Sequence, residues 1–343
     1  METFCLRLGD RLRAAHQEPE QETPDPYRRP SVSRHARWRA LAARLVRRAE
    51  PTLPVPARFA EWAPLFAELD WLFSRLEDEA SRELLVDLVA YQLLPPGRLR
   101  LPTDRPVYWR QLTELERMAA SQRDVAAPPR GVGRRALLRH DLTALGFPIR
   151  VWTRLAAVHT QFVLQSYRSM RGGVDACPGD VVVDAGGCFG DTALLFALKV
   201  GDRGRIYSFE FTPANLEIYR ENLALNPALA ARVEIVERAL WSESGIELLR
   251  RGDGPSTWVE LADSARGGAR ARAVALDDFV LEKALDRLDL VKMDIEGAEF
   301  EALRGAESCL REFRPDLALC VYHQSVDFVR LARAVDALDL GYR

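Results

Sequence analysis

The residues with the clearest chemical meaning form the run Asp-Ala-Gly-Gly-Cys-Phe-Gly-Asp-Thr at 184–192. An apolar strand at 181–184 ends here in a carboxylate, and a helix at 191–199 follows. Because glycine has no Cβ, backbone N–H groups in such a turn can approach a ligand closely. Nucleotide-like cofactors bind at turns of this kind in doubly wound sheets. The run therefore predicts a cofactor site at the end of the strand, and a tight turn without a ligand is the alternative.

The details of this turn favour a cofactor that carries positive charge and no phosphate. The NAD fingerprint Gly-x-Gly-x-x-Gly requires glycine where this chain has Ala185. A carboxylate at the strand end would also repel a pyrophosphate. S-adenosylmethionine has a cationic sulfur, an amine and no phosphate, and it suits the turn better. We expect cofactor contacts from six residues of the run, namely Asp184, Gly186, Gly187, Gly190, Asp191 and Thr192.

Further candidate cofactor residues end the next two strands. Glu210 closes a strand at 205–210, where a carboxylate can accept hydrogen bonds from both ribose hydroxyls. Phe211 would then flank the adenine. Ala239 follows the strand at 233–237, where backbone groups could read the adenine edge.

Candidate catalytic residues lie on the fourth and fifth strands of the pattern. Lys292 and Asp294 alternate along the strand at 289–295, so both should point to one face. Asp294 would lie near the cationic sulfur or the acceptor. His323 follows the strand at 317–322 and is the natural candidate for a general base, because a histidine titrates near neutral pH.

A divalent cation is the alternative to a histidine base. Asp294 and Glu296 could hold such an ion, which would acidify the acceptor hydroxyl. Glu299 and Glu301 follow in the next helix, and we expect both on its surface.

An alternating order of strands and helices must position these residues. From residue 180 onwards the pattern implies a mainly parallel α/β sheet with helices on both faces. The carboxyl ends of its strands would form one crevice, where the candidate residues meet. Helices are expected at 191–199, 214–226, 298–311 and 325–338, with a variable β region at 245–275.

The first 150 residues show a different pattern. Residues 1–35 are expected to be a flexible arm, because 17–35 is rich in Glu, Pro and Arg. Residues 36–150 are expected to form a mostly helical domain, since apolar residues recur at helical spacing between 59 and 94. Short strands are expected near 98–102 and 147–151. A helix at 155–169 would then lead into a second domain, residues 151–343.

The composition describes an ordinary globular protein. Its 343 residues carry a net charge of −2, and 48% of them are hydrophobic, so nothing favours a nucleic-acid partner. No run of about eighteen apolar residues predicts a membrane span, and no apolar leader opens the chain. The five cysteines are scattered, which indicates free thiols. A cytoplasmic location is therefore expected.

The segments 183–192, 209–215, 222–226, 276–279 and 291–299 together resemble the FkbM family of S-adenosylmethionine-dependent methyltransferases. The resemblance covers about residues 175–325. It implies a class I methyltransferase, Rossmann-like fold for 151–343. It also implies O-methylation of a hydroxyl on a sugar, polysaccharide or natural product, hence a small-molecule or glycan acceptor.

The end of the chain departs from that family's pattern. The resemblance implies two further strands after the helix at 325–338, and the sequence leaves little or no room for this closing hairpin. Either the chain is truncated at its C-terminus, or an edge strand is exposed and would favour association into a homo-oligomer.

Two functions of other classes remain open at this point. A nicotinamide-dependent oxidoreductase would bind NAD, but Ala185 interrupts its fingerprint. A catalytically inactive binding or scaffold module is favoured by the missing terminal strands. The retention of Asp184, Glu210 and Asp294 opposes that interpretation.

Overall fold

The structure is a computed structural model. It describes residues 3–17, 55–95, 98–99, 101, 106–121, 137–169, 173–252, 254–262 and 268–342. The chain divides into two compact units, residues 1–110 and 111–342. The boundary therefore precedes the one expected at 150/151. The physical reason is that Leu142, Ile149 and Val151 are buried in the core of the second unit.

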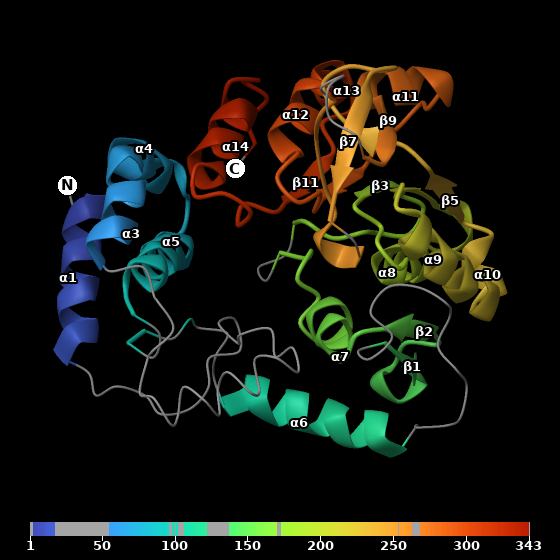
Figure 1. Cartoon of the computed structure of the whole chain (residues 1–343), viewed down its shortest axis with the longest axis horizontal. Helices are drawn as coiled ribbons and strands as arrows, with labels where there is room; N and C mark the ends of the chain where they lie inside the picture. Colours follow the sequence, from blue (N-terminus) through green and yellow to red (C-terminus); the bar gives the residue numbers. More distant parts are fainter. Residues whose placement is uncertain are drawn as a thin grey trace. The chain divides into compact units, whose positions relative to one another are not determined.

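The first unit is helical in its described part (Figure 1). Helix α1 packs against α4 and α5, and Phe4 lies edge-on to Phe66 and Phe73 with ring centroids 6.3 Å apart. The N–H of Phe4 also donates to Asp70 Oδ1 at 2.8 Å. The start of the expected arm is thus a packed helix, and its remainder at 18–35 lies outside the described residues. The helices are α1 (Phe4–Gln17), α3 (Val55–Trp62), α4 (Phe66–Arg75) and α5 (Glu79–Leu93), and α6 (Pro106–Ser121) follows.

The second unit is built on a five-stranded parallel sheet with the order β11-β10-β3-β4-β5. The chain moves outward from β3 in one direction and later from β10 in the other, so the strand order reverses between these two neighbours. Ligands bind at such a switch point in open α/β sheets. The strands are β3 (Val181–Ala185), β4 (Arg205–Phe209), β5 (Val233–Val236), β10 (Leu290–Met293) and β11 (Asp316–Leu319).

Alternate residues of each strand face opposite layers of helices, as the pleat requires. Val182 and Leu290 pack with α8, α9 and α10, whereas Val183 and Val291 pack with α11 to α14. Figure 1 shows these two groups of helices on either side of the sheet. The expected α/β class with helices on both faces is confirmed. The helices are α8 (Asp191–Val200), α9 (Pro213–Leu225), α10 (Pro227–Ala230), α11 (Leu276–Glu282), α12 (Glu299–Arg304), α13 (Glu307–Phe313) and α14 (Asp327–Asp336).

Two smaller β elements complete the second unit. A four-stranded sheet has the order β6-β9-β7-β8 and occupies the expected variable region. An antiparallel pair, β1 and β2, is tied to α9 by Asn222, whose amide bonds both the N–H and the C=O of Trp152 at 2.6 and 2.9 Å. The strands are β1 (Leu138–Asp141), β2 (Arg150–Thr153), β6 (Ala239–Leu240), β7 (Glu247–Arg251), β8 (Trp258–Leu261) and β9 (Arg270–Val274).

Three expected elements differ in the structure. The helix expected at 155–169 consists of α7 (Leu155–Ala157) and a π-helical turn (Val158–Val163), and it ends there. The helix expected at 298–311 is divided into α12 and α13 at Gly305, where a Cβ would lie only 2.2 Å from the carbonyl oxygen of Trp241. Residues 98, 99 and 101 are not in a strand, and β2 pairs with β1 instead.

None of the helices in the described ranges combines the length and apolarity that a membrane crossing needs. All five cysteines are free.

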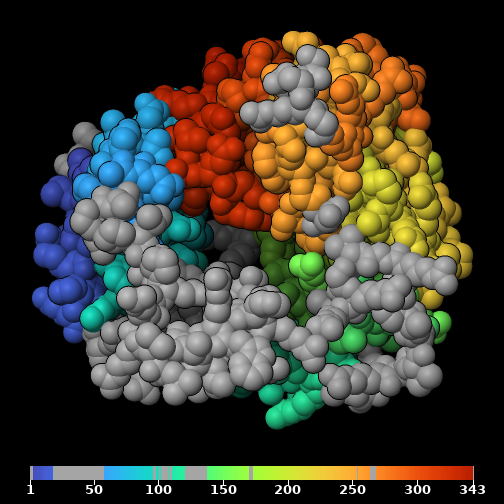
Figure 2. All heavy atoms as spheres, viewed as in Figure 1, coloured from blue at the N-terminus to red at the C-terminus, as the bar shows by residue number. Residues whose placement is uncertain are grey.

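On the face shown in Figure 2, atoms of the C-terminal part, coloured red, form one continuous surface, which agrees with the contact between α12 and α14.

Candidate functional site

A row of polar side chains crosses three neighbouring strands beneath the turn at 186–190, which we call the glycine turn. Lys292 on β10 pairs in register with Asp184 on β3, which pairs with Ser208 on β4. Asp184 Oδ2 accepts hydrogen bonds from the hydroxyls of Ser208 and Thr192, each at 2.9 Å. All four side chains are buried. The row is therefore a hydrogen-bonded support for the turn above it.

Lys292 is the positive charge of this row. Its Nζ lies 3.0 Å from Asp184 Oδ1 and donates to the carbonyl oxygens of Ala185 and Gly186, each at 2.9 Å. Burial opposes the charge, but the carboxylates of Asp184 and Asp294 outweigh it and raise the pKa of Lys292. The ammonium thus remains protonated and holds the backbone of the turn.

The glycines of the turn are required mainly by packing. A Cβ on Gly190 would lie 2.2 Å from the ring of Tyr219, and one on Gly187 would lie 2.2 Å from Ser208 Oγ. Gly186 has φ +85°, and its Cβ would lie 1.9 Å from the backbone oxygen of Asp294. Only Gly186 among these three lines the cavity described next. The absence of side chains therefore lets β3, β4 and β10 come close together.

A cavity opens at the carboxyl ends of β3, β4, β5 and β10. Glu210, Asp294 and Glu296 line it with carboxylates. Arg238, the basic lining residue among those described, is already bonded to both oxygens of Glu282 at 2.6 and 2.9 Å. The cavity is therefore electronegative. Other lining residues are Cys188, Phe211, Thr212, Asn215, Ala239, Thr257 and Trp258.

Glu210 is held in place by the start of α9. Its Oε1 accepts the N–H groups of Phe211 and Thr212 at 2.7 and 2.6 Å, and its Oε2 accepts the amide of Asn215 at 2.9 Å. Burial raises the pKa of Glu210, and this effect outweighs the hydrogen bonds, which lower it. Beside it, Asn215 Oδ1 and Thr212 Oγ1 are buried and lack a hydrogen-bond partner among the described residues. Such atoms are rare without a ligand or a water.

Asp294 is held by the hydroxyl groups of two tyrosines. Tyr167 donates to its Oδ2 at 2.6 Å, and Tyr322 donates to its Oδ1 at 2.8 Å. Burial would raise its pKa, but His323, Lys292 and the two phenols outweigh burial and hold the pKa well below its usual range. Asp294 is therefore an anion that binds protons weakly.

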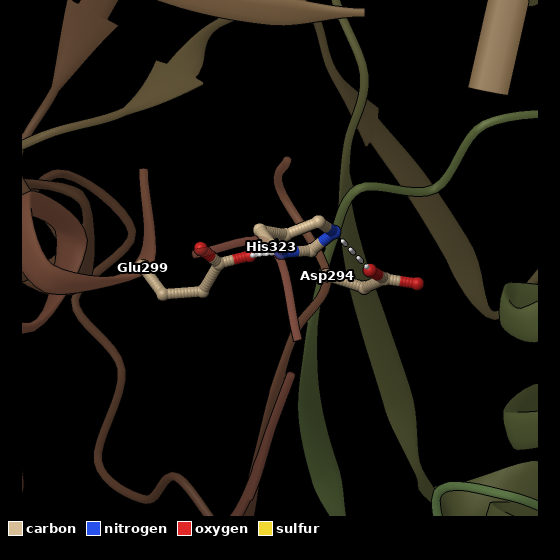
Figure 3. Close-up of side chains that lie close together, drawn as sticks. All are labelled: Asp294, Glu299 and His323. Carbon is tan, nitrogen blue, oxygen red and sulfur yellow. Dashed lines mark ion pairs between the residues drawn. The ribbon is translucent and has the colours of Figure 1, made fainter. Parts of the chain in front are cut away.

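His323 lies between two carboxylates and does not line the cavity. Figure 3 shows one ring nitrogen facing Glu299 and the other facing Asp294. Nδ1 is 3.1 Å from Glu299 Oε1, and Nε2 is 3.4 Å from Asp294 Oδ1. Burial opposes the charge of the ring, but contacts with these carboxylates raise the pKa of His323 to about 10. The ring therefore already carries a proton at neutral pH, which does not support its role as a base.

Glu299 does not lie on the surface, contrary to expectation. It is fully buried, and its carboxylate accepts the N–H groups of Ile295 and Gly297 at 2.8 and 3.0 Å. Together with its contact to His323, these bonds clamp the loop after β10. Glu301 is half-buried in the same first turn of α12, and Arg304 donates a hydrogen bond to it at 2.9 Å.

Asp294, Glu299 and His323 bring three potential metal ligands within 4.8 Å of one another. The imidazole ring, however, lies between the two carboxylates and turns a different nitrogen to each (Figure 3). The three groups therefore form a row of carboxylate, imidazolium and carboxylate, and their ligand atoms do not converge on one point. Glu296, the expected second ligand, approaches the ring at 3.7 Å from Nε2.

The expected cofactor residues fall into two groups. One group lines the cavity and consists of Gly186, Glu210, Phe211, Ala239 and Asp294. The other supports the turn from below and consists of Asp184, Gly187, Gly190, Asp191 and Thr192. Asp191, for example, accepts the hydroxyl of Thr153 at 2.8 Å.

Two tyrosines were missed in the sequence. Tyr167 comes from the segment after the π-helical turn and Tyr322 from the segment after β11, so no local pattern connects either of them with Asp294. Tyr322 directly precedes His323 at a strand end, and this position was its available signal.

Comparison with known proteins shows that part of the second unit is similar to methyltransferases. Residues 184–343 match a family model described as the methyltransferase FkbM domain. A curated relative, methyltransferase sdnD of Sordaria araneosa, is 31% identical, and the match covers 37% of this chain and 60% of the relative. The chain thus spans less than two thirds of that relative.

Solved structures of methyltransferases are also similar. One is methyltransferase FkbM from Methylobacillus flagellatus KT, with 19% identity, a TM-score of 0.48, and coverage of 82% of this chain and 56% of that chain. Another is Aeropyrum pernix fibrillarin, with 16% identity, a TM-score of 0.29, and coverage of 48% and 57%. By the family model, residues 184–343 of this chain are thus similar to the methyltransferase FkbM domain.

Proposed function

We propose that this protein transfers a methyl group from S-adenosylmethionine to a hydroxyl group of a small-molecule or glycan acceptor. The observation that carries the proposal is the shared cavity, where Gly186, Glu210 and Asp294 meet at the ends of three neighbouring strands. The curated relative is named a methyltransferase, which supports the reaction class.

The residues of the cavity fit this cofactor. Its three carboxylates favour a ligand with positive charge and disfavour a pyrophosphate. The unpartnered oxygens of Asn215 and Thr212 can accept hydrogen bonds, and ribose hydroxyls and an adenine amine are donors.

Each residue has a specific part in this proposal. S-adenosylmethionine, when bound, supplies a methyl group on a cationic sulfur. Glu210 has about four acceptor positions, three of which are occupied, so about one remains for a ribose hydroxyl. Gly186 leaves room at the mouth of the turn, and the permanent anion Asp294 attracts the cationic end of the cofactor.

Positioning supplies most of the expected acceleration. The acceptor oxygen must lie about 3 Å from the methyl carbon and in line with the bond that breaks. Asp294 is well suited to orient a hydroxyl, because its own orientation is fixed by two phenols and an imidazole.

Isothermal calorimetry of the full chain tests the proposal. S-adenosylmethionine and its demethylated product should both bind in a one-to-one ratio, whereas NAD should not. Transfer of tritium from a labelled methyl group to sugars, glycans and polyols then tests the acceptor class. Binding of NAD would support the oxidoreductase instead, and binding of the methyl donor without transfer would favour an inactive module.

A further inference from the structure

Glu296 occupies an unusual position in the loop between β10 and α12. Its backbone is left-handed with φ +56°, and Gly297 follows with φ +98°. This conformation is rare for a residue with a side chain and requires support from its surroundings. The support comes from Glu299, whose carboxylate bonds the N–H groups on both sides of Glu296 at 2.8 and 3.0 Å.

In this loop conformation Glu296 lines the cavity, and its carboxylate oxygens are available to accept hydrogen bonds. Its side chain is 31% exposed, and its carboxylate accepts no hydrogen bond from the residues that the structure describes. The other two lining carboxylates differ. Glu210 accepts three hydrogen bonds, and Asp294 accepts two from tyrosines.

Charged groups from three directions face Glu296. His323 Nε2 lies 3.7 Å away, and Asp294 and Glu299 add two negative charges. Burial and these two carboxylates raise the pKa of Glu296, although the imidazolium works against them. A carboxylate with a raised pKa is a stronger base than one with a lowered pKa, which is the state of Asp294.

We propose that Glu296 is the general base that accepts the proton of the acceptor hydroxyl, and that Glu299 and His323 position it. This role rests on the proposed methyl transfer. In that step the acceptor oxygen forms a bond to the methyl carbon as the bond from sulfur to that carbon breaks. The electron pair stays on sulfur as a thioether, and the hydroxyl proton moves to a carboxylate oxygen of Glu296 and then to water.

The test compares the wild-type chain with Glu296→Gln and Glu296→Asp, and with Glu301→Gln as a matched control on α12. The probe is S-adenosylmethionine with a tritiated methyl group, offered with a panel of sugars and polyols. Glu296→Gln should still bind the donor, because Glu210 and Asp294 remain in the cavity, but it should transfer methyl about 10²–10⁴-fold more slowly. Glu296→Asp should regain part of the rate, and Glu301→Gln should match wild type.

A second readout needs no acceptor. In protein labelled with ¹³C at glutamate carboxyls, the resonance missing from Glu296→Gln assigns the residue, and its titration gives the pKa. A pKa above that of an exposed glutamate is expected. A value at or below that of an exposed glutamate would overturn the assignment.

The outcomes separate the base from the proposed function. If wild type binds no S-adenosylmethionine, the proposed function fails and the base fails with it. If wild type transfers methyl and Glu296→Gln does so equally fast, the base alone is wrong. Loss of wild-type transfer on chelation, with recovery on adding Mg²⁺, would also overturn it, because a metal ion would then acidify the hydroxyl.

Discussion

Lys292 and Asp184 form a fully buried ion pair, with Nζ 3.0 Å from Oδ1, at matching positions of the neighbouring strands β10 and β3. The same ammonium donates to two carbonyl oxygens of the glycine turn. The pair therefore connects the central strands of the sheet with the backbone that lines the cavity.

Replacing Lys292 by Met should destabilise the protein by about 3–5 kcal/mol, because it leaves the Asp184 charge buried without its partner. Urea unfolding measures the effect. Lys283→Met is the control, since Lys283 pairs with Glu234 in a partly exposed position, and its loss should cost about 1 kcal/mol or less. Equal costs for the two variants would contradict the structural role given to the buried pair.

Gly190→Ala should be much more destabilising than Gly179→Ala. Both glycines have positive φ, +79° and +94°, so each alanine carries a backbone cost of about 1–2 kcal/mol. Only at Gly190 does the new Cβ meet a ring, that of Tyr219 at 2.2 Å, which should add about 1–3 kcal/mol. The difference between the two free energies of unfolding isolates this contact. No difference would mean that the turn does not pack on Tyr219.

His323 should stabilise the fold in a pH-dependent manner. Its pKa is raised from 6.5 to about 10, so the native state holds the proton more tightly than the unfolded chain does. The stabilisation is complete below about pH 6.5 and is lost as the pH rises towards 10. The gap in unfolding free energy between wild type and His323→Gln should therefore narrow over this range. A difference in unfolding free energy that stays constant with pH would refute the ion pairs of His323 with Glu299 and Asp294. Ring NMR signals that titrate near pH 6.5 would refute them as well.

Glu210→Ala should weaken binding of S-adenosylmethionine by about 10–100-fold, the effect of losing one hydrogen bond to a charged acceptor. Because the carboxylate also accepts the N–H groups of Phe211 and Thr212, the variant should lose about 1–2 kcal/mol of stability as well. Calorimetry and urea unfolding measure the two effects. Glu217→Ala, at an exposed position of α9, should change neither. Unchanged donor affinity would refute the ribose contact.

Local patterns in the sequence predicted much of the second unit. The strand, glycine turn and helix at 181–199 are each visible as short runs of apolar or special residues, and the structure has them at 181–185 and 191–200. The division of 298–311 into two helices was not visible, and neither was the close contact of Gly305 at this division with the backbone of Trp241, which belongs to a distant segment. The first unit was harder still, since helical periodicity marks neither where helices end nor that α1 packs against α4 and α5.

The sequence alone determined the fold class and the resemblance to the FkbM family, because strand and helix periodicity and the order of short motifs are properties of neighbouring residues. Only the tertiary structure decided the chemistry of the individual side chains. It buried Glu299 beside His323 and brought two tyrosines that are distant in sequence into hydrogen bonds with Asp294. It also left the carboxylate of Glu296 available to accept hydrogen bonds at the cavity. Burial and the proximity of charges decide which group holds a proton, and both arise from segments that meet only after folding.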